Sequence, residues 1–501
     1  MVAHLWANLS NDYPPDGFSF PYQFMISFGS LLFAFLGLYF LRSILLLYFS
    51  DNIVSISLLA LVLGSNYLNY TAIDGALTHN NLFTIYVLLI YTSIQFYKRS
   101  NISKAIIIGA LIGISALTRP TEIIAFIIPF AWGINLFSVK DLHTRVQFLI
   151  NKHLLLIIMI FMCFSIGSIQ LIYWKYVSGN WLVYSYQDQG FSWLHPHIKD
   201  GLFSYKGGWL TYSPLMIFSL IGFYPLYKTK QTIFSTSIVF ICLFMYIAFS
   251  WDIWWYGGSL GQRSMIQAYP ILLFPLSSFI EYISKQKKWL KMSILFIGIL
   301  FCYINIWFTH QAHEGGLFHA GHMTRSYYWK TLGRFDDNIE NLKLLDTDEY
   351  YYGTRKNIQV IYKNDFEKLK GKHYQIIDDS SNTVLYLDAN NQQSEAFSFN
   401  TNTNNDFDWI RAQADFKINE KEWNFWTMTQ FVISFYSGNN IIKERSIRLQ
   451  RLLWGGAKKT IFIDVKKPNK PFDKIRVHFW NGNGNKKILI DNLNVETFNS
   501  N

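Results

Sequence analysis

The sequence predicts a polytopic α-helical membrane domain of about ten spans, followed by a β-sandwich domain resembling a jelly roll. Of its 501 residues, 51% are hydrophobic, 18% are aromatic and 15% are charged, a balance that excludes a soluble protein with a single core. Apolar runs of about 17 to 25 residues, the length that crosses a hydrocarbon layer, recur up to residue 310. Beyond it the chain is polar, and from about residue 384 short alternating segments are separated by turn residues. These observations divide the chain into residues 1–310, an α/β linker region 311–383 and a sandwich 384–501.

The predicted spans are separated by loops of two kinds. The spans cover residues 21–47, 53–70, 82–97, 102–117, 122–137, 153–177, 209–227, 232–250, 265–283 and 289–309. Lysine and arginine gather in every second connection: Lys98, Arg99 and Lys104; Lys140, Arg145 and Lys152; Lys228 and Lys230; and Lys285, Lys287, Lys288 and Lys291. Because basic loops usually remain in the cytoplasm, we expect residues 1–20, 71–81, 118–121, 178–208, 251–264 and everything after 310 to face outward.

Composition also excludes several classes of function. The formal charge of +11 could indicate nucleic acid binding, but much of it lies in short loops between spans, so no nucleic acid partner is predicted. All three cysteines fall inside apolar runs, which leaves the aqueous parts without a disulfide. The chain contains no phosphate-binding P-loop, no G-x-S-x-G elbow and no H-E-x-x-H motif. ATP-driven transport and soluble-type hydrolysis are therefore poorly supported.

The connector WDIWWYGGSLGQR, residues 251–263, combines aromatic residues, glycines and one arginine between two apolar runs. An arginine close to the membrane is costly without a partner, so Arg263 is a candidate phosphate ligand. Trp255 and Tyr256 could form a wall against which a sugar stacks, and Gln262 is a further candidate for substrate binding. An aromatic membrane anchor with a snorkelling arginine explains the stretch equally well.

Two more basic residues on predicted outer segments could contact phosphate. In ALTRPTE, Arg119 precedes Pro120 in a very short connection, where it would face the same aqueous region as Arg263. A salt bridge from Arg119 to Glu122 that pins the turn is an equal alternative. Lys206, just before the span that opens at residue 209, is a third candidate phosphate contact.

The carboxylates of the outer segments are few. In AIDGALTHNN, Asp74 and His79 could bind an acceptor hydroxyl, although structural polar contacts are the stronger alternative. Two isolated ligands do not make a metal site, so none is predicted there. Asp12 and Asp16 are the carboxylates of the first segment, and Asp16 followed by glycine is also typical of a turn.

These features together resemble the GT-C superfamily of integral-membrane glycosyltransferases. The likeness covers about 300 residues and rests on outward-facing spans, DGFSFPYQ, ALTRPTE, WWYGGSLGQR and a polar C-terminal domain. It is closest to the bacterial enzymes similar to protein mannosyltransferases and aminoarabinose transferases. The family begins with one further span and an acidic first outer loop, which would lie before Met1 here. We therefore expect an N-terminally truncated or mis-started chain.

The resemblance implies transfer of a sugar from a polyprenyl-phosphate donor to a protein, lipid or glycan outside the cytoplasm. It implies a bacterial inner-membrane location with the C-terminal domain in the periplasm. Arg263, Arg119 and Lys206 would hold the lipid phosphate, and Asp16 or Asp12 would serve as the catalytic carboxylate. No cofactor is certain, and a divalent cation is an option in such enzymes. The alternatives are a non-catalytic protein that binds a lipid-linked glycan, an inactive fragment, or a transporter, for which charge inside the spans is scarce.

The predicted sandwich carries several aromatic residues that could bind carbohydrate by ring stacking. They are Trp409, Trp423, Trp426, Trp454 and Trp480. Packing into the core of the sandwich is the favoured alternative for most of them.

Overall fold

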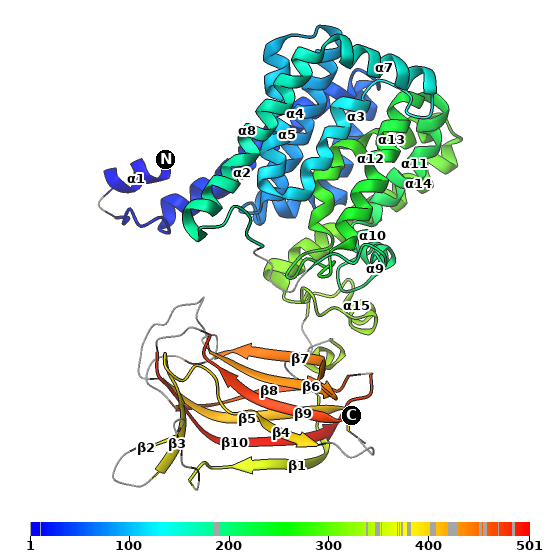
Figure 1. Ribbon diagram of the computed structural model, residues 1–501. Helices are drawn as coiled ribbons and strands as arrows, with labels where there is room; N and C mark the ends of the chain where they lie inside the picture. The colour runs from blue at the N-terminus through cyan, green and yellow to red at the C-terminus, as the bar shows by residue number, and fades with distance from the viewer. Residues whose placement is uncertain are drawn as a thin grey trace. The chain divides into compact units, whose positions relative to one another are not determined.

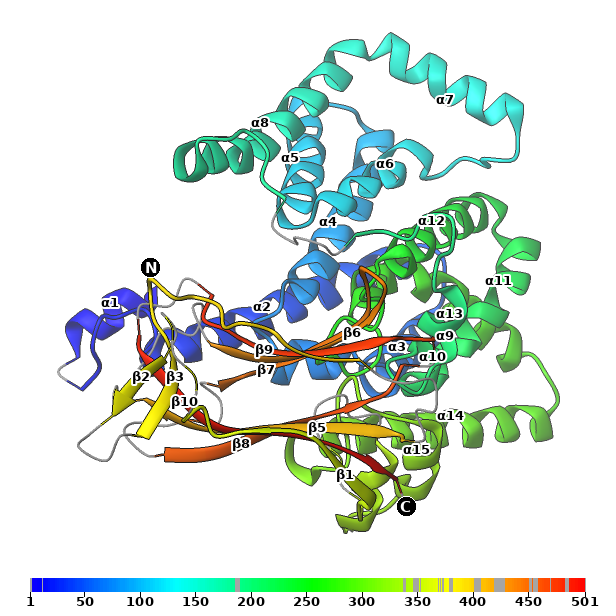
Figure 2. The same cartoon turned by 60° about the horizontal axis from the view of Figure 1, so that its bottom comes forward.

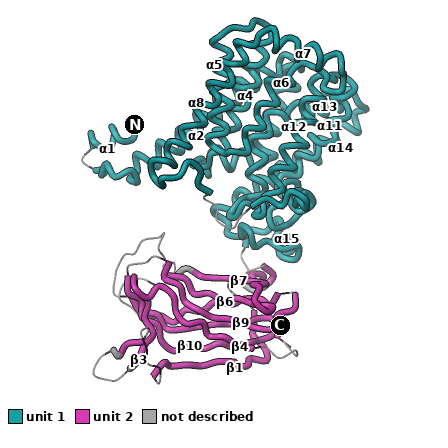
Figure 3. Tube along the Cα trace, in the orientation of Figure 1, with its two compact units in different colours: residues 1–337 teal, residues 338–501 magenta. Residues whose placement is uncertain are grey.

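The computed structural model describes the whole chain except a set of short stretches. These are residues 1, 11, 185–189, 337–338, 346–350, 352, 368, 370, 372–373, 378–381, 401–406, 419–428, 450–452, 454–457, 469, 483–485 and 501. The chain forms two compact units, Met1–Asp337 and Asn338–Asn501, which Figure 3 shows in different colours. The predicted linker, residues 311–383, is thus shared between the two units.

The first unit is helical (Figure 1). Its α-helices are α1 (Val2–Leu9), α2 (Phe20–Leu45), α3 (Asp51–Gly64), α4 (Thr78–Lys98), α5 (Ile102–Thr118), α6 (Ile127–Ala131), α7 (Val139–Asn151), α8 (His153–Ser178), α9 (Ile198–Phe203), α10 (Trp209–Tyr212), α11 (Ile217–Thr229), α12 (Gln231–Ser250), α13 (Tyr269–Ser284), α14 (Lys288–His310) and α15 (Arg325–Thr331). Figures 1 and 2 show α1 and the beginning of α2 extending away from the other helices of this unit.

Five helical stretches are long and apolar enough to cross a membrane. They are Phe20–Leu45, His153–Ser178, Gln231–Ser250, Arg263–Ser284 and Lys288–Gly315, and they coincide with five of the ten predicted spans. Two other predicted spans are interrupted. The span 122–137 divides between the 3-10 turn Pro120–Phe126 and the short helix α6, and the span 209–227 divides at Pro214, because proline has no N–H for a helical hydrogen bond.

Small residues set the closest helix contacts of this unit. Gly109 and Gly113 are spaced as G-x-x-x-G on α5 and pack against α8, where a Cβ on Gly113 would lie 2.8 Å from the carbonyl oxygen of Cys163. Such spacing lets two backbones approach closely, which is how helices associate within lipid. The other face of α8 is exposed and apolar, as expected for a helix that meets lipid.

The second unit is all-β, with antiparallel strands. These are β1 (Lys356–Asn364), β2 (Tyr374–Ile377), β3 (Asn382–Leu387), β4 (Phe397–Asn400), β5 (Trp409–Ile418), β6 (Gln430–Ser437), β7 (Asn440–Arg448), β8 (Lys458–Lys466), β9 (Lys474–Trp480) and β10 (Ile488–Asn499). One sheet has the order β2-β3-β10-β5-β8, with β1 also paired to β10, and the other has the order β4-β9-β6-β7.

The two sheets enclose one apolar core. Along β5, Ile410, Ala412 and Phe416 are fully buried, and they share the core with Ile433 of β6 and Val477 of β9. This alternation is the period of two that the sequence displayed, because successive side chains of a strand point to opposite faces. The predicted sandwich is confirmed as a pair of antiparallel sheets around a common core.

The tryptophans of this unit divide between core and surface. Trp409 is buried and packs with Phe498 and Tyr351 in a small cluster at the end of β5, as the core alternative predicted. Trp480 is 41% exposed at the end of β9. The predicted positions Trp423, Trp426 and Trp454 lie outside the described residues.

Candidate functional site

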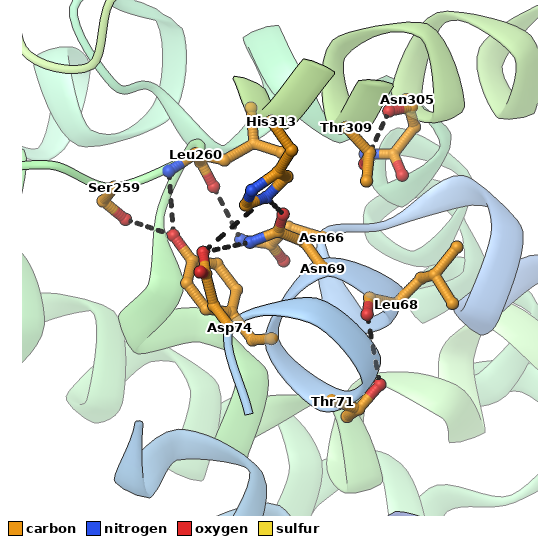
Figure 4. Close-up of polar contacts among 11 residues, drawn as sticks. Asn66, Leu68, Asn69, Thr71, Asp74, Ser259, Leu260, Asn305, Thr309 and His313 are labelled. Atoms are coloured by element: carbon orange, nitrogen blue, oxygen red, sulfur yellow. Dashed lines mark hydrogen bonds and ion pairs between the residues drawn. The ribbon is translucent and has the colours of Figure 1, made fainter. Parts of the chain in front are cut away.

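The connector between α12 and the 3-10 turn Arg263–Ala268 is fixed from one side by the segment that follows α3. Asn66 is fully buried, and its Nδ2 donates to the carbonyl oxygens of Leu260, at 3.2 Å, and Gln262, at 3.1 Å. The Tyr70 hydroxyl accepts from the backbone N–H of Leu260 at 2.8 Å and pairs with the Ser259 hydroxyl at 2.9 Å. Figure 4 shows Ser259 and Leu260 beside this segment. The connector is therefore held in one shape by buried hydrogen bonds, which are costly to leave unmade.

From the other side, the connector is fixed by the end of the long predicted outer loop. Gln262, a predicted substrate-binding residue, is fully buried and donates from Nε2 to the carbonyl oxygens of Gly207, at 3.0 Å, and Trp254, at 2.9 Å. Both donor contacts of this amide are made inside the protein, so we assign Gln262 a role in holding the connector. Lys206, next to Gly207, places its Nζ 4.1 Å from the centre of the Trp255 ring.

The same loop is tied down at its earlier part through Asp252. This carboxylate accepts from the backbone N–H of Gly190 at 2.7 Å and from the Ser192 hydroxyl at 2.7 Å. Three segments that are far apart in the sequence thus meet around residues 251–262. Asp188, which the sequence placed in this loop, lies outside the described residues.

Two arginines lie around one ring of the connector. The Arg119 and Arg263 guanidinium carbons are 5.8 Å and 6.0 Å from the centre of the Tyr256 ring. Tyr256 and the following Gly257 have left-handed backbone angles, with φ of 54° and 64°, and a tyrosine adopts this conformation only at a cost. Arg119 and Arg263 thus lie around one ring, and their role as phosphate ligands stays a prediction.

Neither guanidinium is neutralised by a hydrogen-bonded carboxylate within the described part of the chain. Nε of Arg263 is buried without a hydrogen-bond partner there. The alternative salt bridge from Arg119 to Glu122 is also not formed among the described residues, because Glu122 accepts from Tyr86 and Gln267 instead. Two neighbouring cations, of which Arg263 has a buried donor without a partner, would be stabilised by a bound anion.

Tyr256 takes part in this arrangement through its ring rather than as a proton donor to a ligand. Its hydroxyl donates to the carbonyl oxygen of Ala248 at 2.9 Å. Burial raises the pKa of this hydroxyl, and the opposing attraction of Arg119 is smaller. The phenol therefore stays neutral at physiological pH, and its ring is the feature that the two guanidinium groups share.

A carboxylate lies near this pair, in a cluster formed by two π-helical turns. Asp74 follows the turn Asn69–Ile73, and His313 belongs to the turn Gln311–Gly315 after α14. Asn69 donates from Nδ2 to Asp74 at 3.0 Å, its Oδ1 lies 2.6 Å from Nε2 of His313, and the His313 and Asp74 side chains are 3.9 Å apart. Figure 4 shows His313 pointing toward Asn69 and Asp74. Turns of this rare type occur frequently at functional sites.

Asp74 is the carboxylate of this cluster that solvent and ligands can reach. Its side chain is 44% exposed, and it interacts electrostatically with Arg263. One oxygen is held by Asn69, which fixes the orientation of the carboxylate. His79, the other residue predicted from AIDGALTHNN, is instead buried and contacts Gln267.

Asp12 and Asp16, the predicted catalytic carboxylates, lie on the exposed segment between α1 and α2. Asp16 accepts from the backbone N–H groups of Phe18 and Ser19, both at 2.8 Å, and these bonds hold the pKa of its carboxyl below the usual value. This is the turn role that the sequence offered as an alternative. The backbone N–H of Asp12 donates to the Ser10 hydroxyl, and no hydrogen bond or ion pair joins either carboxylate to Arg119 or Arg263 within the described residues.

A resident metal ion, which the sequence resemblance left as an option, finds no support in this arrangement. The described residues contain no group of three or more histidine, cysteine, aspartate or glutamate side chains that could hold one. Asp74 and His313 alone do not provide the usual ligand count of a protein metal site.

Four residues of the site could not be singled out from the sequence: Asn66, Asn69, Gln267 and His313. Asn66 and Asn69 lie within the predicted span 53–70, and the one indication of their role in the sequence was the presence of two amide side chains in an apolar run. His313 lies just after the last span, and only its polarity next to an apolar helix pointed to it.

No protein-family profile and no curated protein matches this sequence. Among solved structures, the chain has a likeness to the arabinosyltransferase EmbB from Mycobacterium smegmatis, with 8% identity and a TM-score of 0.32, over 93% of this chain and 57% of that one. The chain also has a likeness to the CBM22-1 xylan-binding domain of Paenibacillus barcinonensis Xyn10C, with 9% identity and a TM-score of 0.20 over 29% of this chain and 99% of that domain. It also has one to latent PorU from Porphyromonas gingivalis, with 11% identity and a TM-score of 0.18 over 31% of this chain and 13% of that one. No TM-score reaches 0.5, so none of these likenesses assigns a function to this chain.

Proposed function

We propose that the protein is a glycosyltransferase of the GT-C type, which moves a sugar from a polyprenyl-phosphate donor to an acceptor outside the cytoplasm. The observation that carries the proposal is the pair of guanidinium groups around Tyr256, neither of them hydrogen-bonded to a carboxylate among the described residues. They belong to a helical unit with five stretches that could cross a membrane, as binding of a lipid-linked phosphate requires.

The chemistry divides between the two charges of the site. Breaking the bond between the sugar carbon and the phosphate oxygen leaves an additional negative charge on the phosphate. Arg119 and Arg263 are placed to stabilise that charge, and fixed cations of this kind lower a barrier most when they need no rearrangement. Lys206, held over Trp255 by a cation–π contact, is a third cation on an adjoining segment.

On the acceptor side, we propose Asp74 as the reacting carboxylate in place of Asp12 and Asp16, because it interacts electrostatically with Arg263. It would accept the proton of an acceptor hydroxyl as the new bond to the sugar carbon forms. Asn69 keeps one of its oxygens in place, and its exposed position leaves access for an acceptor. The acceptor would be a protein, lipid or glycan, as the sequence resemblance implies.

The orientation belongs to the same proposal. The basic loops would lie in the cytoplasm of a bacterial cell, and the residues of the site would open to the other face of the inner membrane, together with the second unit in the periplasm. Two extracytoplasmic reactants, a lipid-linked sugar and its acceptor, would then meet at the connector 251–263.

The test is sugar transfer by the purified full-length chain in lipid nanodiscs, with polyprenyl phosphates that each carry one radiolabelled pentose or hexose. We expect Arg263→Ala and Asp74→Asn each to lower turnover by about 100-fold or more. The control Arg42→Ala removes an exposed arginine paired with Asp51 and should stay within about twofold of the parental rate. Parental protein that binds these lipids without releasing sugar would instead establish the non-catalytic binding alternative, and equal rates for parental protein and Arg263→Ala would refute the assignment of the site.

A further inference from the structure

A chain of buried polar side chains runs behind the two arginines. The Tyr86 hydroxyl donates to Oε2 of Glu122 at 2.6 Å, and Nε2 of Gln267 donates to Oε1 of the same carboxyl group at 3.0 Å. Oε1 of Gln267 lies 3.0 Å from Nδ1 of His79. All four side chains are at most 3% exposed, so their hydrogen bonds are made within the protein and not with solvent.

This chain joins the elements that carry the arginines. Glu122 lies in the 3-10 turn Pro120–Phe126, and this turn begins directly after Arg119. Gln267 lies in the 3-10 turn that begins at Arg263. Tyr86 and His79 both belong to α4. The hydrogen bonds therefore attach both turns to one helix and fix the positions from which the two guanidinium groups extend.

The chemistry of the chain determines which nitrogen of His79 carries a proton. A carboxyl oxygen that receives a hydrogen bond from Gln267 requires the amide NH₂ on that side, which turns the amide oxygen toward His79. An amide oxygen can only accept, so Nδ1 of His79 must be the donor. In the neutral imidazole, Nε2 then carries a lone pair.

The surroundings keep His79 neutral. It precedes the predicted span 82–97 and is nearly fully buried, with the Tyr70 ring 6.5 Å away. Burial and then Arg119 lower its pKa to about 3, with a smaller contribution from Arg263 opposed by the bond to Gln267. A third positive charge beside two guanidinium groups is unfavourable, so the ring offers an acceptor instead of a cation.

We propose that His79 is a specificity-determining residue whose Nε2 accepts a hydrogen bond from a hydroxyl group of the phosphate-linked ligand held by Arg119 and Arg263. Glu122 and Gln267 are positioning residues that keep the proton of His79 on Nδ1. The inference rests on the proposed function, since the ligand that combines a phosphate with a neighbouring hydroxyl is the lipid-linked sugar. A bare polyprenyl phosphate would use the arginines but not His79.

An exchange of two side chains tests the direction of the hydrogen bonds. In Glu122→Gln, when Tyr86 continues to donate to the amide oxygen, the new amide NH₂ faces Gln267. Gln267 must then turn its own NH₂ toward His79, which moves the imidazole proton to Nε2. In the double variant Glu122→Gln with Gln267→Glu, the carboxylate at 267 again accepts from Nδ1 of His79, and the parental tautomer returns. His79→Asn is a second, independent variant, because its amide can still donate to Gln267 but has no atom at the place of Nε2.

The measurement is the dissociation constant of the full chain in nanodiscs for bare polyprenyl phosphate and for polyprenyl phosphates that each carry one pentose or hexose. The readout is the ratio of the two constants, which reports the contribution of the sugar alone. We expect Glu122→Gln and His79→Asn to reduce the preference for the sugar-bearing lipid by about tenfold, the effect of losing about 1.4 kcal/mol. The double variant should restore it, and Glu281→Gln, a carboxyl paired with Lys230 and Lys285, should not change it.

The outcomes separate the inference from the proposed function. Parental protein that binds no polyprenyl phosphate would refute the proposed function and the inference with it. Parental protein that prefers a sugar-bearing lipid, with the same preference in His79→Asn, would overturn the inference and leave the function intact. Should Glu122→Gln fail to fold, as judged by its binding of bare polyprenyl phosphate, the His79→Asn result decides.

Discussion

Replacement of Asn66 by leucine tests whether buried hydrogen bonds hold the connector that carries Tyr256. Asn66 is fully buried, and its side chain serves three partners: the carbonyl oxygens of Leu260 and Gln262, and the Tyr269 hydroxyl, which donates to Oδ1 at 2.6 Å. Leucine has a similar size but no polar atom. The substitution therefore removes three hydrogen bonds without opening a large cavity.

The magnitude follows from the cost of each lost bond. Hydrogen bonds inside membrane proteins average about 0.6 kcal/mol each in double-mutant cycles, so three would give about 2 kcal/mol. In a water-excluded protein interior, a buried group left without its partner costs about 1–3 kcal/mol, which raises the total to at least about 3 kcal/mol. We expect a loss of about 2–5 kcal/mol in the free energy of unfolding. Because the connector loses its anchor, we also expect weaker binding of polyprenyl phosphate at Arg263.

The assay is unfolding of the purified chain in a mild detergent, together with its binding of polyprenyl phosphate. Asn180→Leu is the matched control, because Asn180 is exposed on the predicted outer loop and should change stability by less than about 0.5 kcal/mol. If Asn66→Leu unfolds at the parental denaturant concentration and binds the lipid equally well, these hydrogen bonds do not hold the connector.

Three further substitutions test the two units separately. Arg145→Met should lower the stability of the helical unit by about 2–3 kcal/mol in detergent unfolding, since the buried guanidinium of α7 donates to the carbonyl oxygens of Phe130, at 2.9 Å, and Trp132, at 2.8 Å. An unfolding midpoint equal to the parental one would show that water replaces the guanidinium as hydrogen-bond donor to these two carbonyl oxygens. Gly222→Ala should reduce the yield of folded protein in size-exclusion chromatography, because a Cβ there would lie 1.9 Å from the carbonyl oxygen of Pro275. The control Gly29→Ala, which has open space around its Cβ, should not reduce the yield. Equal yields for the two variants would contradict the tight packing of α11 on α13. Asp464→Ala should lower the free energy of unfolding of the β unit by about 3–5 kcal/mol, since it removes a fully buried carboxylate and leaves the part-buried Arg411 guanidinium without the partner that holds Nε at 2.7 Å. Parental resistance to proteolysis would show that this pair is dispensable.

The fold could be anticipated wherever a single pattern of apolar residues, either a long run or a strict alternation, dominated a segment of the sequence. Long apolar runs such as those of α8 and α14 became single helices, and the alternation along β5 became a strand with one buried face. Hydropathy alone cannot place the breaks inside a run. The proline at 120 and the serine–proline pair at 213–214 interrupt helices by removing or redirecting backbone hydrogen bonds. Hydropathy averaged over the length of a span is not sensitive to such single residues.

The basic part of the site could be anticipated, but its other polar members could not. Arg119 and Arg263 stand out because they lie beside spans in the predicted outer connections, whereas most basic residues of the predicted membrane domain gather in the predicted cytoplasmic loops. Gln267 and His313 are ordinary polar residues in the sequence, and their importance comes from contacts with residues more than a hundred positions away. For Asp16 the sequence offered two roles, and its carboxylate makes the hydrogen bonds of the turn alternative, while the catalytic role stays a prediction.

The most direct test of the anion site is the binding of bare polyprenyl phosphate to the full chain, measured by native mass spectrometry from nanodiscs. The account predicts a complex with one lipid for the parental protein and for Arg42→Ala, and at least a tenfold weaker complex for the double variant Arg119→Ala with Arg263→Ala. Equal occupancy in the parental protein and the double variant would show that these two arginines do not form the phosphate site.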